Sequence, residues 1–253
     1  MQLMKNALYV KSFLARRRKK KVNLEEYYEQ QISCQIPYLS SIFELFLGKR
    51  EDGLFLEIGA NDGVSCSNTW GLAARGWTGF LVEAIPDFAA ACVLNHKEHG
   101  KVSVYQIAIG STDGEEVTFN LGGQLTTANQ ELNMEYQNTD WARSIVTSSQ
   151  MTLKTQTLDT FIRNHQIQEG FDLLVVDVEG FEAQVFSGFT LAKWRPKMLI
   201  VEITDTHPQI RSNAKSDALL GQMIISAEYE IAYKDCINTV FIRRDIWKNT
   251  FEL

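Results

Sequence analysis

The sequence is poor in proline, cysteine and histidine. Its 253 residues include 4 prolines, 16 glycines, 4 cysteines and 4 histidines. So few prolines and glycines exclude a collagen-like chain and a proline-rich disordered one. No C-x-x-C pair occurs, and scattered cysteines are typical of reduced thiols rather than of a disulfide framework or a zinc site; they are Cys34, Cys66, Cys92 and Cys236. The chain is long enough for one large domain with a full core.

Acidic residues are missing from the first 24 positions, which hold eight lysines and arginines. Because the whole chain has a net charge of −6, the remainder has −14 once those eight are subtracted. A body so acidic excludes nucleic acid as a partner, since phosphate binding needs a cationic face. The arm suits peripheral contact with an anionic membrane, or it is a solvated tail.

No apolar run is long enough to span a bilayer, and in the first 24 residues the positive charge follows the apolar stretch "ALYVKSFLA". A secretory signal has its charge first, so we expect a cytoplasmic protein. Three segments follow from composition and pattern. Residues 1–23 form the basic arm, residues 24–52 a helical lead-in, and residues 53–253 the main domain, with an insertion at 110–156.

Short apolar runs alternate with helical stretches in the main domain. Most of these runs are apolar at successive positions, which is typical of strands covered by helices on both faces. The strands are predicted at 54–58, 79–84, 102–109, 171–178 and 197–203, and the helices at 65–76, 86–100 and 181–189. Residues 227–247 predict a terminal antiparallel hairpin. The fold class is therefore α/β, with a doubly wound, mostly parallel sheet.

The insertion at 110–156 breaks this alternation. It predicts a hairpin in "EEVTFNLGG" (115–123), followed by a polar stretch up to Gln156. A connection so long in a compact domain is typical of a lid or a substrate-binding element. Thr126, Thr127 and Asn129 lie in it and are candidates for contacts with substrate hydroxyls.

The turn after the first strand, "EIGANDG", is a candidate ligand loop, because open α/β sheets bind ligands at the carboxyl ends of their strands. Gly59 and Gly63 allow close backbone approach. The dinucleotide fingerprint would need further glycines where Asn61 and Val64 stand. Two acids in the turn, Glu57 and Asp62, would repel a pyrophosphate.

A further acid, Glu83, ends the second strand, twenty residues past Gly63. A carboxylate at this place accepts hydrogen bonds from both hydroxyls of a ribose. The ligand predicted by the loop and this acid has a ribose, positive charge and no phosphate at the loop. S-adenosylmethionine meets all three conditions.

The motifs "FLEIGANDGVSCSNT", "LVEAIPDF", "QIAIGSTDGEEVTF", "QTLDTFI", "LLVVDVEGFEAQVFSGF" and "LIVEI" occur in the order found in FkbM-type S-adenosylmethionine-dependent methyltransferases. The chain resembles that family over roughly residues 54–204. The resemblance implies a class I methyltransferase (Rossmann-like) fold, with a seven-stranded sheet whose last strand is antiparallel. Many relatives O-methylate sugars or other hydroxylated natural products, so the resemblance implies a small-molecule or glycan acceptor.

The chain departs from the family pattern at two places. Val175 stands where relatives often have a lysine, two positions before the aspartate of "DVEG". The glutamate and proline after the second strand are separated by two inserted residues, Ala84 and Ile85.

Acids at the ends of the fourth and fifth predicted strands are the candidates for chemistry. Asp177 is expected near the methyl-transfer centre, in contact with cofactor or substrate. Glu179 is a candidate proton acceptor or a helix cap, and Glu202 a candidate substrate contact. Together these three carboxylates could hold Mg²⁺, although no metal is required. His207 is a further candidate proton acceptor, because histidine titrates near neutral pH.

The remaining assignments are weaker. Asn61 and Asp62 are candidates for the methionine end of the cofactor, and backbone groups around Ala108 for the adenine. His96 and His99 are interpreted as part of a solvated helix end, since a zinc site would need two further ligands. Alternatives to O-methylation stay open: N- or C-methylation, an NAD-dependent sugar enzyme, and a catalytically silent module that recruits partners. The oligomeric state is not predicted.

Overall fold

The computed structural model describes residues 34–251. The predicted basic arm (1–23), with its expected membrane contact, and the first ten residues of the lead-in lie outside the described residues. Among the described residues, no helix is both long and apolar enough to cross a membrane.

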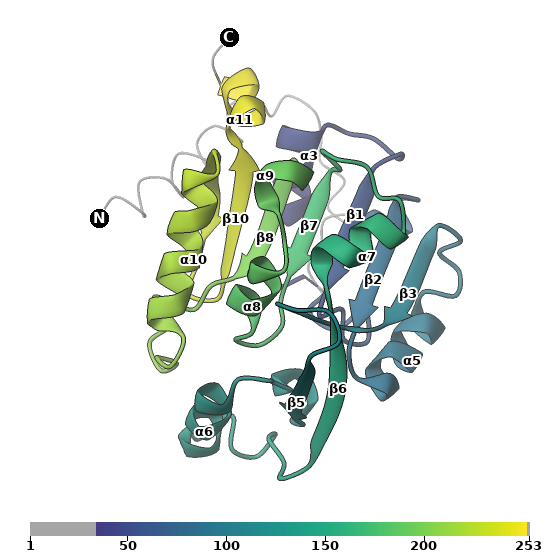
Figure 1. Cartoon of the computed structure of the whole chain (residues 1–253). Coiled ribbons are helices and arrows are strands. Elements are labelled where there is room, and N and C mark those ends of the chain that lie inside the picture. Colours follow the sequence, from purple (N-terminus) through teal and green to yellow (C-terminus); the bar gives the residue numbers. More distant parts are fainter. Residues whose placement is uncertain (1–33, 252–253) are drawn as a thin grey trace.

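A seven-stranded sheet forms the centre of the domain (Figure 1). Its order is β3-β2-β1-β7-β8-β10-β9, and β10 is antiparallel to both neighbours while the other pairs from β3 to β8 are parallel. The predicted fold class, including the antiparallel last strand and the terminal hairpin, is confirmed. The strands are β1 (Leu54–Ile58), β2 (Thr78–Glu83), β3 (Val102–Gln106), β7 (Leu173–Val176), β8 (Met198–Glu202), β9 (Tyr229–Lys234) and β10 (Asn238–Arg243).

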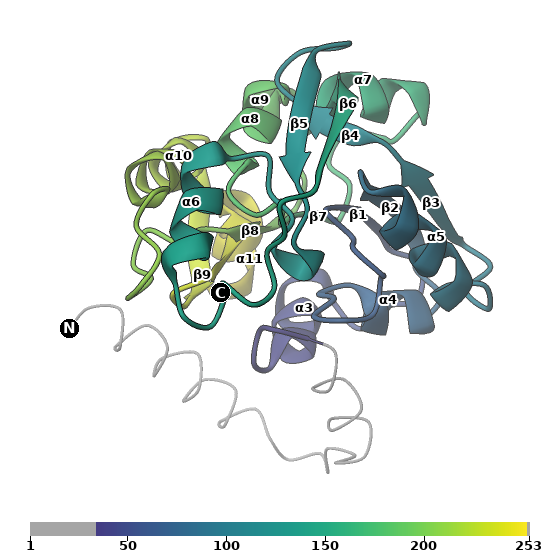
Figure 2. The same ribbon diagram turned by 90° about the horizontal axis from the view of Figure 1, so that it is seen from below.

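Helices cover both faces of this sheet, as Figures 1 and 2 show. One face carries α3 (Leu39–Leu47), α4 (Trp70–Ala74) and α5 (Pro86–Asn95). The opposite face carries α7 (Leu158–Asn164), α8 (Glu182–Ser187), α9 (Leu191–Trp194) and α10 (Ala214–Ser226). The last helix, α11 (Arg244–Phe251), packs on α3, where the rings of Phe46 and Trp247 stack with centroids 5.5 Å apart.

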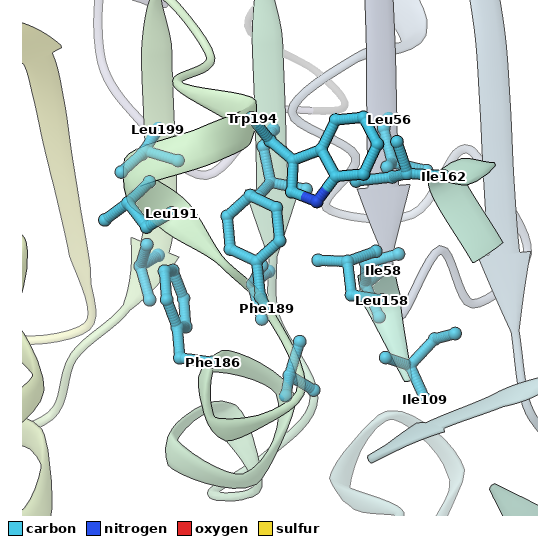
Figure 3. Packing of buried hydrophobic residues seen from close by; sticks show 14 of the residues in the cluster. Leu56, Ile58, Ile109, Leu158, Ile162, Phe186, Phe189, Leu191, Trp194 and Leu199 are labelled. Atoms are coloured by element: carbon cyan, nitrogen blue, oxygen red, sulfur yellow. The ribbon is translucent and has the colours of Figure 1, made fainter. Parts of the chain in front are cut away.

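The central strands are apolar at successive positions because neighbouring residues point to opposite faces of the sheet, and helices cover both faces. On β1, Phe55 belongs to the cluster with α3 and α4, whereas Leu56 and Ile58 belong to the cluster with α7, α8 and α9 (Figure 3). Alternate residues of a strand point to opposite faces. The predicted cover of helices on both faces is therefore confirmed.

Two predicted helices are shorter than expected. The helix predicted at 65–76 begins only at Trp70, because Ser67 Oγ accepts hydrogen bonds from the amides of Thr69 (3.2 Å) and Trp70 (3.1 Å). A hydroxyl that bonds to local amides favours a turn or a cap over continued helix. The helix predicted at 86–100 begins at Pro86 as expected but ends at Asn95.

The predicted hairpin at 115–123 is wrong. β5 (Glu116–Asn120) pairs antiparallel with β6 (Gln150–Thr157), which lies about thirty residues further along the chain. The strand predicted at 102–109 also divides, and its end forms β4 (Ala108–Gly110), which pairs parallel with β6. The insertion is thus a second sheet of order β4-β6-β5, with the short η1 (Gly123–Leu125) and α6 (Gln130–Asn138) between its strands. In Figure 1, β5 and α6 lie beyond the carboxyl ends of the main strands.

Candidate active site

A cavity of about 290 Å³ lies where β1, β2, β7 and β8 end. The order of strands reverses between β1 and β7, and ligands of open α/β sheets bind at such a switch point. Among the described residues, no lysine or arginine lines the cavity. Its acidic lining consists of Glu57, Glu83, Asp177, Glu179 and Glu202.

The loop after β1 is wedged between the ends of β2 and β7. The amides of Gly59 and Ala60 both donate to Val82 O, at 2.9 and 3.1 Å. Gly59 has φ +85°, and a Cβ there would stand 1.7 Å from the carbonyl oxygen of Asp177. Only glycine fits this position, because both the conformation and the space exclude a side chain. The loop thereby brings the end of β7 against the floor of the cavity.

Glu83 ties the tip of β2 to this loop. Its Oε2 accepts a hydrogen bond from the amide of Asn61 and its Oε1 one from the amide of Ile85, each at 2.8 Å. Ile85 is one of the two residues inserted between Glu83 and Pro86. This departure from the family pattern therefore supplies one of the two amides that hold the Glu83 carboxylate. Burial raises the pKa of Glu83, and the amides oppose that rise. Each oxygen keeps a lone pair that a ribose hydroxyl can use.

Glu57 lies deeper than the sequence indicates. It is 4% exposed, and its Oε2 accepts a hydrogen bond from Thr69 Oγ1 at 2.5 Å. Burial, opposed by the Thr69 bond and helped by the charge of Asp177, raises the pKa of Glu57 to about 7. Together with Asn61, it lines the cavity at the loop.

Asp62 and Gly63 do not line the cavity. The carboxylate of Asp62 accepts bonds from the amides of Val64 and Ser65 and from Ser65 Oγ, so it stabilises the turn itself. The predicted contact of Asp62 with the methionine end of a cofactor has no support in this geometry.

Gly63 instead lets α5 approach the loop. A Cβ on Gly63 would lie 2.7 Å from the ring of His96, whose Nε2 is 2.9 Å from Gly63 O. The interpretation of His96 as solvated is wrong, since it is only 4% exposed. Its Nδ1 lies 3.0 Å from Nδ1 of His99, and the Trp70 ring packs against both. His96 therefore buttresses the ligand loop, through a long-range contact that the sequence does not signal.

Three of the predicted residues, Asp177, Glu179 and Glu202, come together. One carboxylate oxygen of each lies within 4.8 Å of those of the other two. Burial raises the pKa of Asp177 to about 6 and, with the charge of Asp177, that of Glu179 to about 8. The pKa of Glu202 is raised well above its ordinary value, by burial and by the charges of the other two. The three carboxylates thus disfavour one another's ionisation, and no described lysine or arginine lines the cavity beside them.

The backbone at Glu179 is held by the insertion. Glu179 has φ +53°, and its carbonyl accepts a hydrogen bond from Thr127 Oγ1 at 2.5 Å. Asn129, the N-cap of α6, donates to Gly180 O at 3.1 Å. Thr127 is fully buried and does not line the cavity, whereas Thr126 does. Thr127 and Asn129 therefore shape the loop that carries Glu179, in place of the substrate contacts predicted for them.

The helix-capping role weighed for Glu179 is not found, because α8 has Phe181 at its N-cap and no side-chain cap; Glu182, the first residue of α8, instead bonds back to the preceding loop. Its Oε1 accepts bonds from the amides of Val178 (2.8 Å) and Gly180 (3.3 Å), which closes the loop before α8. The carboxylate of Glu179 instead accepts a hydrogen bond from Tyr136 Oη at 2.6 Å. Tyr136 and Trp141, which both line the cavity, were not predicted, because nothing in their local pattern indicates contact with β7.

His207 lines the cavity, but its Nδ1 accepts bonds from the amides of Gln209 (3.2 Å) and Ile210 (2.8 Å). A neutral imidazole that accepts at Nδ1 carries its proton on Nε2. In this geometry His207 has no free lone pair with which to accept a proton. Ala108 is buried in β4 away from the cavity, and its neighbours Ile107 and Ile109 line the space instead.

The strand order, the glycine loop after β1 and the buried acid at the tip of β2 together define a class I methyltransferase. The family model described as "Methyltransferase FkbM domain" matches residues 57–230. The chain belongs to the FkbM methyltransferase family, and it is an S-adenosylmethionine-dependent methyltransferase.

Solved structures of similar fold are methyltransferases of low sequence identity. The "METTL16 MTase domain" is 10% identical, with a TM-score of 0.46, and the match covers 82% of this chain and 66% of that one. An O-methyltransferase from Bacillus cereus in complex with SAH is 12% identical, with a TM-score of 0.43, covering 95% and 90%. Precorrin-6y C5,15-methyltransferase from Geobacter metallireducens GS-15 is 9% identical, with a TM-score of 0.42, covering 81% and 86%. A search of curated proteins found no match to this chain.

Proposed function

We propose that this protein binds S-adenosylmethionine along the carboxyl ends of β1, β2 and β7 and methylates a hydroxyl of a sugar, a glycan-like molecule or another hydroxylated metabolite. The observation that carries the cofactor assignment is the position of Glu83, 7% exposed at the tip of β2 and lining the cavity. Its fixed oxygens suit the two hydroxyls of a ribose. The family membership supports the methyl transfer, and many members of the family act on hydroxyls.

The residues of the cavity fit this cofactor. S-adenosylmethionine supplies a methyl group on a positively charged sulfur, together with a positively charged amine. Buried carboxylates stabilise such charges, and Glu57, in β1 just before the loop, lines the cavity. The apolar side chains Ile85, Ile107 and Ile109 suit the flat face of a nucleobase.

We assign the acidic cluster of the cavity to the acceptor. In the transfer, the acceptor oxygen forms a bond to the methyl carbon as the carbon–sulfur bond breaks, and the electron pair of that bond stays on sulfur. The hydroxyl proton must leave the oxygen, and the carboxylate of Asp177 is the member of the cluster best suited to take it. Burial raises the pKa of Asp177 only to about 6, so this group is ionised near neutral pH, whereas Glu179, with a pKa raised to about 8, is largely protonated there. An aligned acceptor also gains rate from orientation alone.

Calorimetry tests the cofactor assignment. We expect S-adenosylhomocysteine to bind the wild-type protein and NAD not to bind. Glu83→Ala should reduce the affinity for S-adenosylhomocysteine by at least about tenfold, because it removes both ribose acceptors and one anchor of the loop. Asp87→Ala, an exposed acid of α5 close by, is the matched control and should bind normally. Failure of the wild type to bind S-adenosylhomocysteine would refute the proposal, as would tight binding of NAD.

The acceptor is found by incubating the protein with tritiated S-adenosylmethionine and fractionated cell extract. Label recovered as a methyl ether on a hydroxylated molecule supports the O-methylation proposal. Label recovered on nitrogen or carbon would overturn it while leaving the cofactor assignment intact.

A further inference from the structure

The carboxylate of Glu202 has no partner within the described part of the chain. Glu202 ends β8, lines the cavity and is 8% exposed, yet its side chain makes no hydrogen bond or ion pair there. Buried carboxylates are nearly always hydrogen-bonded, ion-paired or bound to a metal. An unpaired and buried carboxylate that opens only to a cavity indicates that a ligand completes its environment.

The two acids beside Glu202, Asp177 and Glu179, also favour a positively charged ligand. Asp177 also lacks a side-chain hydrogen bond to any described residue, and Glu179 has the single bond to Tyr136. Since no described lysine or arginine lines the cavity, none is placed to pair with these three carboxyl groups. The short ion pair on this side of the fold, Lys234 with Asp205 at 2.7 Å, uses a different acid.

The spacing of the three carboxylates suits one cation. The closest oxygens of Asp177, Glu179 and Glu202 all lie within 4.8 Å of one another. Oxygens on opposite sides of Ca²⁺ lie about 4.6–5.2 Å apart and those on opposite sides of Mg²⁺ about 4.0–4.2 Å, from the usual metal–oxygen distances. The 4.8 Å limit falls within the range for Ca²⁺ and above that for Mg²⁺, so the three oxygens can meet Ca²⁺ nearly as they lie and Mg²⁺ after side-chain rotations that bring them closer.

We propose that Asp177, Glu179 and Glu202 form a binding site for a hard divalent cation, Mg²⁺, Mn²⁺ or Ca²⁺, on the acceptor side of the cavity. The inference rests on the proposed function, because it assigns to the ion the task of holding the acceptor. An all-oxygen ligand set excludes zinc and copper as the preferred ions.

The insertion at 110–156 fixes the orientation of Glu179, one of the three proposed metal ligands. Tyr136 Oη donates to Glu179 Oε2 at 2.6 Å, which leaves Oε1 for the ion. Thr127 Oγ1 holds the carbonyl of the same residue. Hydrogen bonds of this kind orient metal ligands, and their loss commonly weakens metal affinity 10- to 100-fold. Tyr136 is therefore a positioning residue of the site.

The site also narrows the class of acceptor. Three protein oxygens leave about three of six positions on the ion for other oxygens. An acceptor with two adjacent hydroxyls can occupy two of these positions at once, with one hydroxyl directed at the methyl group. A phosphate or carboxylate directly beside the reacting oxygen would face the remaining acids of the cavity, so we expect an uncharged polyol such as a sugar.

The test uses Mn²⁺ as the probe. Metal-free protein, prepared by dialysis against EDTA, is titrated with Mn²⁺ and the free ion is followed by its electron paramagnetic resonance signal, with and without saturating S-adenosylhomocysteine. We expect one Mn²⁺ per chain, displaced by excess Mg²⁺ or Ca²⁺. Glu202→Gln should abolish this binding, and Tyr136→Phe should weaken it by about tenfold.

The matched control is Glu131→Gln, an exposed acid of α6 outside the cavity, which should bind Mn²⁺ as the wild type does. Glu202→Gln removes a buried charge without changing shape, so circular dichroism should find it folded. The proposal is overturned if the wild type binds no Mn²⁺ at millimolar concentration, or if Glu202→Gln binds it unchanged. Because S-adenosylhomocysteine binding is measured on the same samples, loss of the metal site and loss of the cofactor site are distinguished.

Discussion

Replacing Glu57 with glutamine should make the protein more stable, and by an amount that grows with pH. Glu57 is 4% exposed, and its pKa is raised to about 7 from an ordinary value of 4.5, mainly by burial. A group whose pKa is raised by folding contributes stability that is fully present below its unfolded pKa and lost as pH rises through its folded pKa. The wild type therefore loses stability between about pH 4.5 and pH 7, where ionisation places a charge beside Asp177.

The size of the effect follows from the pKa shift. A difference of about 2.5 pKa units at about 1.36 kcal/mol per unit corresponds to about 3 kcal/mol above pH 7. Glutamine keeps an oxygen that can accept the hydrogen bond from Thr69, so the shape and this bond persist. We thus expect the variant to exceed the wild type by about 3 kcal/mol at pH 8.5, and by much less at pH 5.

Urea unfolding at a series of pH values, without cofactor, measures this difference. Glu131→Gln is the control, because it makes the same substitution at an exposed position of α6. A Glu57→Gln difference that is constant from pH 5 to pH 8.5 would show that Glu57 is not the group that titrates. The same variant should bind S-adenosylhomocysteine more weakly, since it removes one of the acids nearest the loop.

Three further substitutions, measured by urea unfolding, test contacts that hold the loops around the cavity. Gly59→Ala should destabilise the protein by at least about 2 kcal/mol, because its Cβ would lie 1.7 Å from Asp177 O in a conformation that disfavours side chains; a near-neutral effect would contradict the close approach. Thr127→Val should lose about 1–3 kcal/mol by leaving the carbonyl of Glu179 without its buried donor, and an unchanged midpoint would argue against that bond. Ser67→Ala should lose about 1 kcal/mol, because it removes the hydroxyl that accepts hydrogen bonds from the amides of Thr69 and Trp70, whereas a stabilised variant would mean that these bonds are not formed.

The main sheet and the ligand loop could be predicted because their signals are local. Apolar runs on both faces indicate buried parallel strands, and the glycines and acids at the strand ends lie at one edge of the sheet whatever the details of packing. Glu83 and Asp177 were placed correctly at the cavity for this reason. The carboxyl ends of parallel strands lie at one edge of the sheet. The position of a residue just after its strand is therefore sufficient to place it at that edge.

The insertion could not be predicted in the same way, because its pairings are long-range. β5 finds its partner in β6, about thirty residues later, and the turn residues at 120–123 resemble those of a local hairpin. His96 was misinterpreted for the same reason, since its contact with the Gly63 loop crosses 33 residues. A short polar pattern carries no information about which distant backbone group a side chain will meet.

The hydrogen bond from Thr127 to the carbonyl of Glu179, together with that from Tyr136 to its carboxylate, has a consequence for engineering this enzyme. The insertion, which contributes Tyr136 to the cavity, and the β7–α8 connection, which carries Glu179, are thus held together by hydrogen bonds, although about fifty positions separate Thr127 from Glu179. Grafting only residues 110–156 from a relative with another preference should impair turnover. Exchange of that segment together with the β7–α8 connection should transfer the new preference intact.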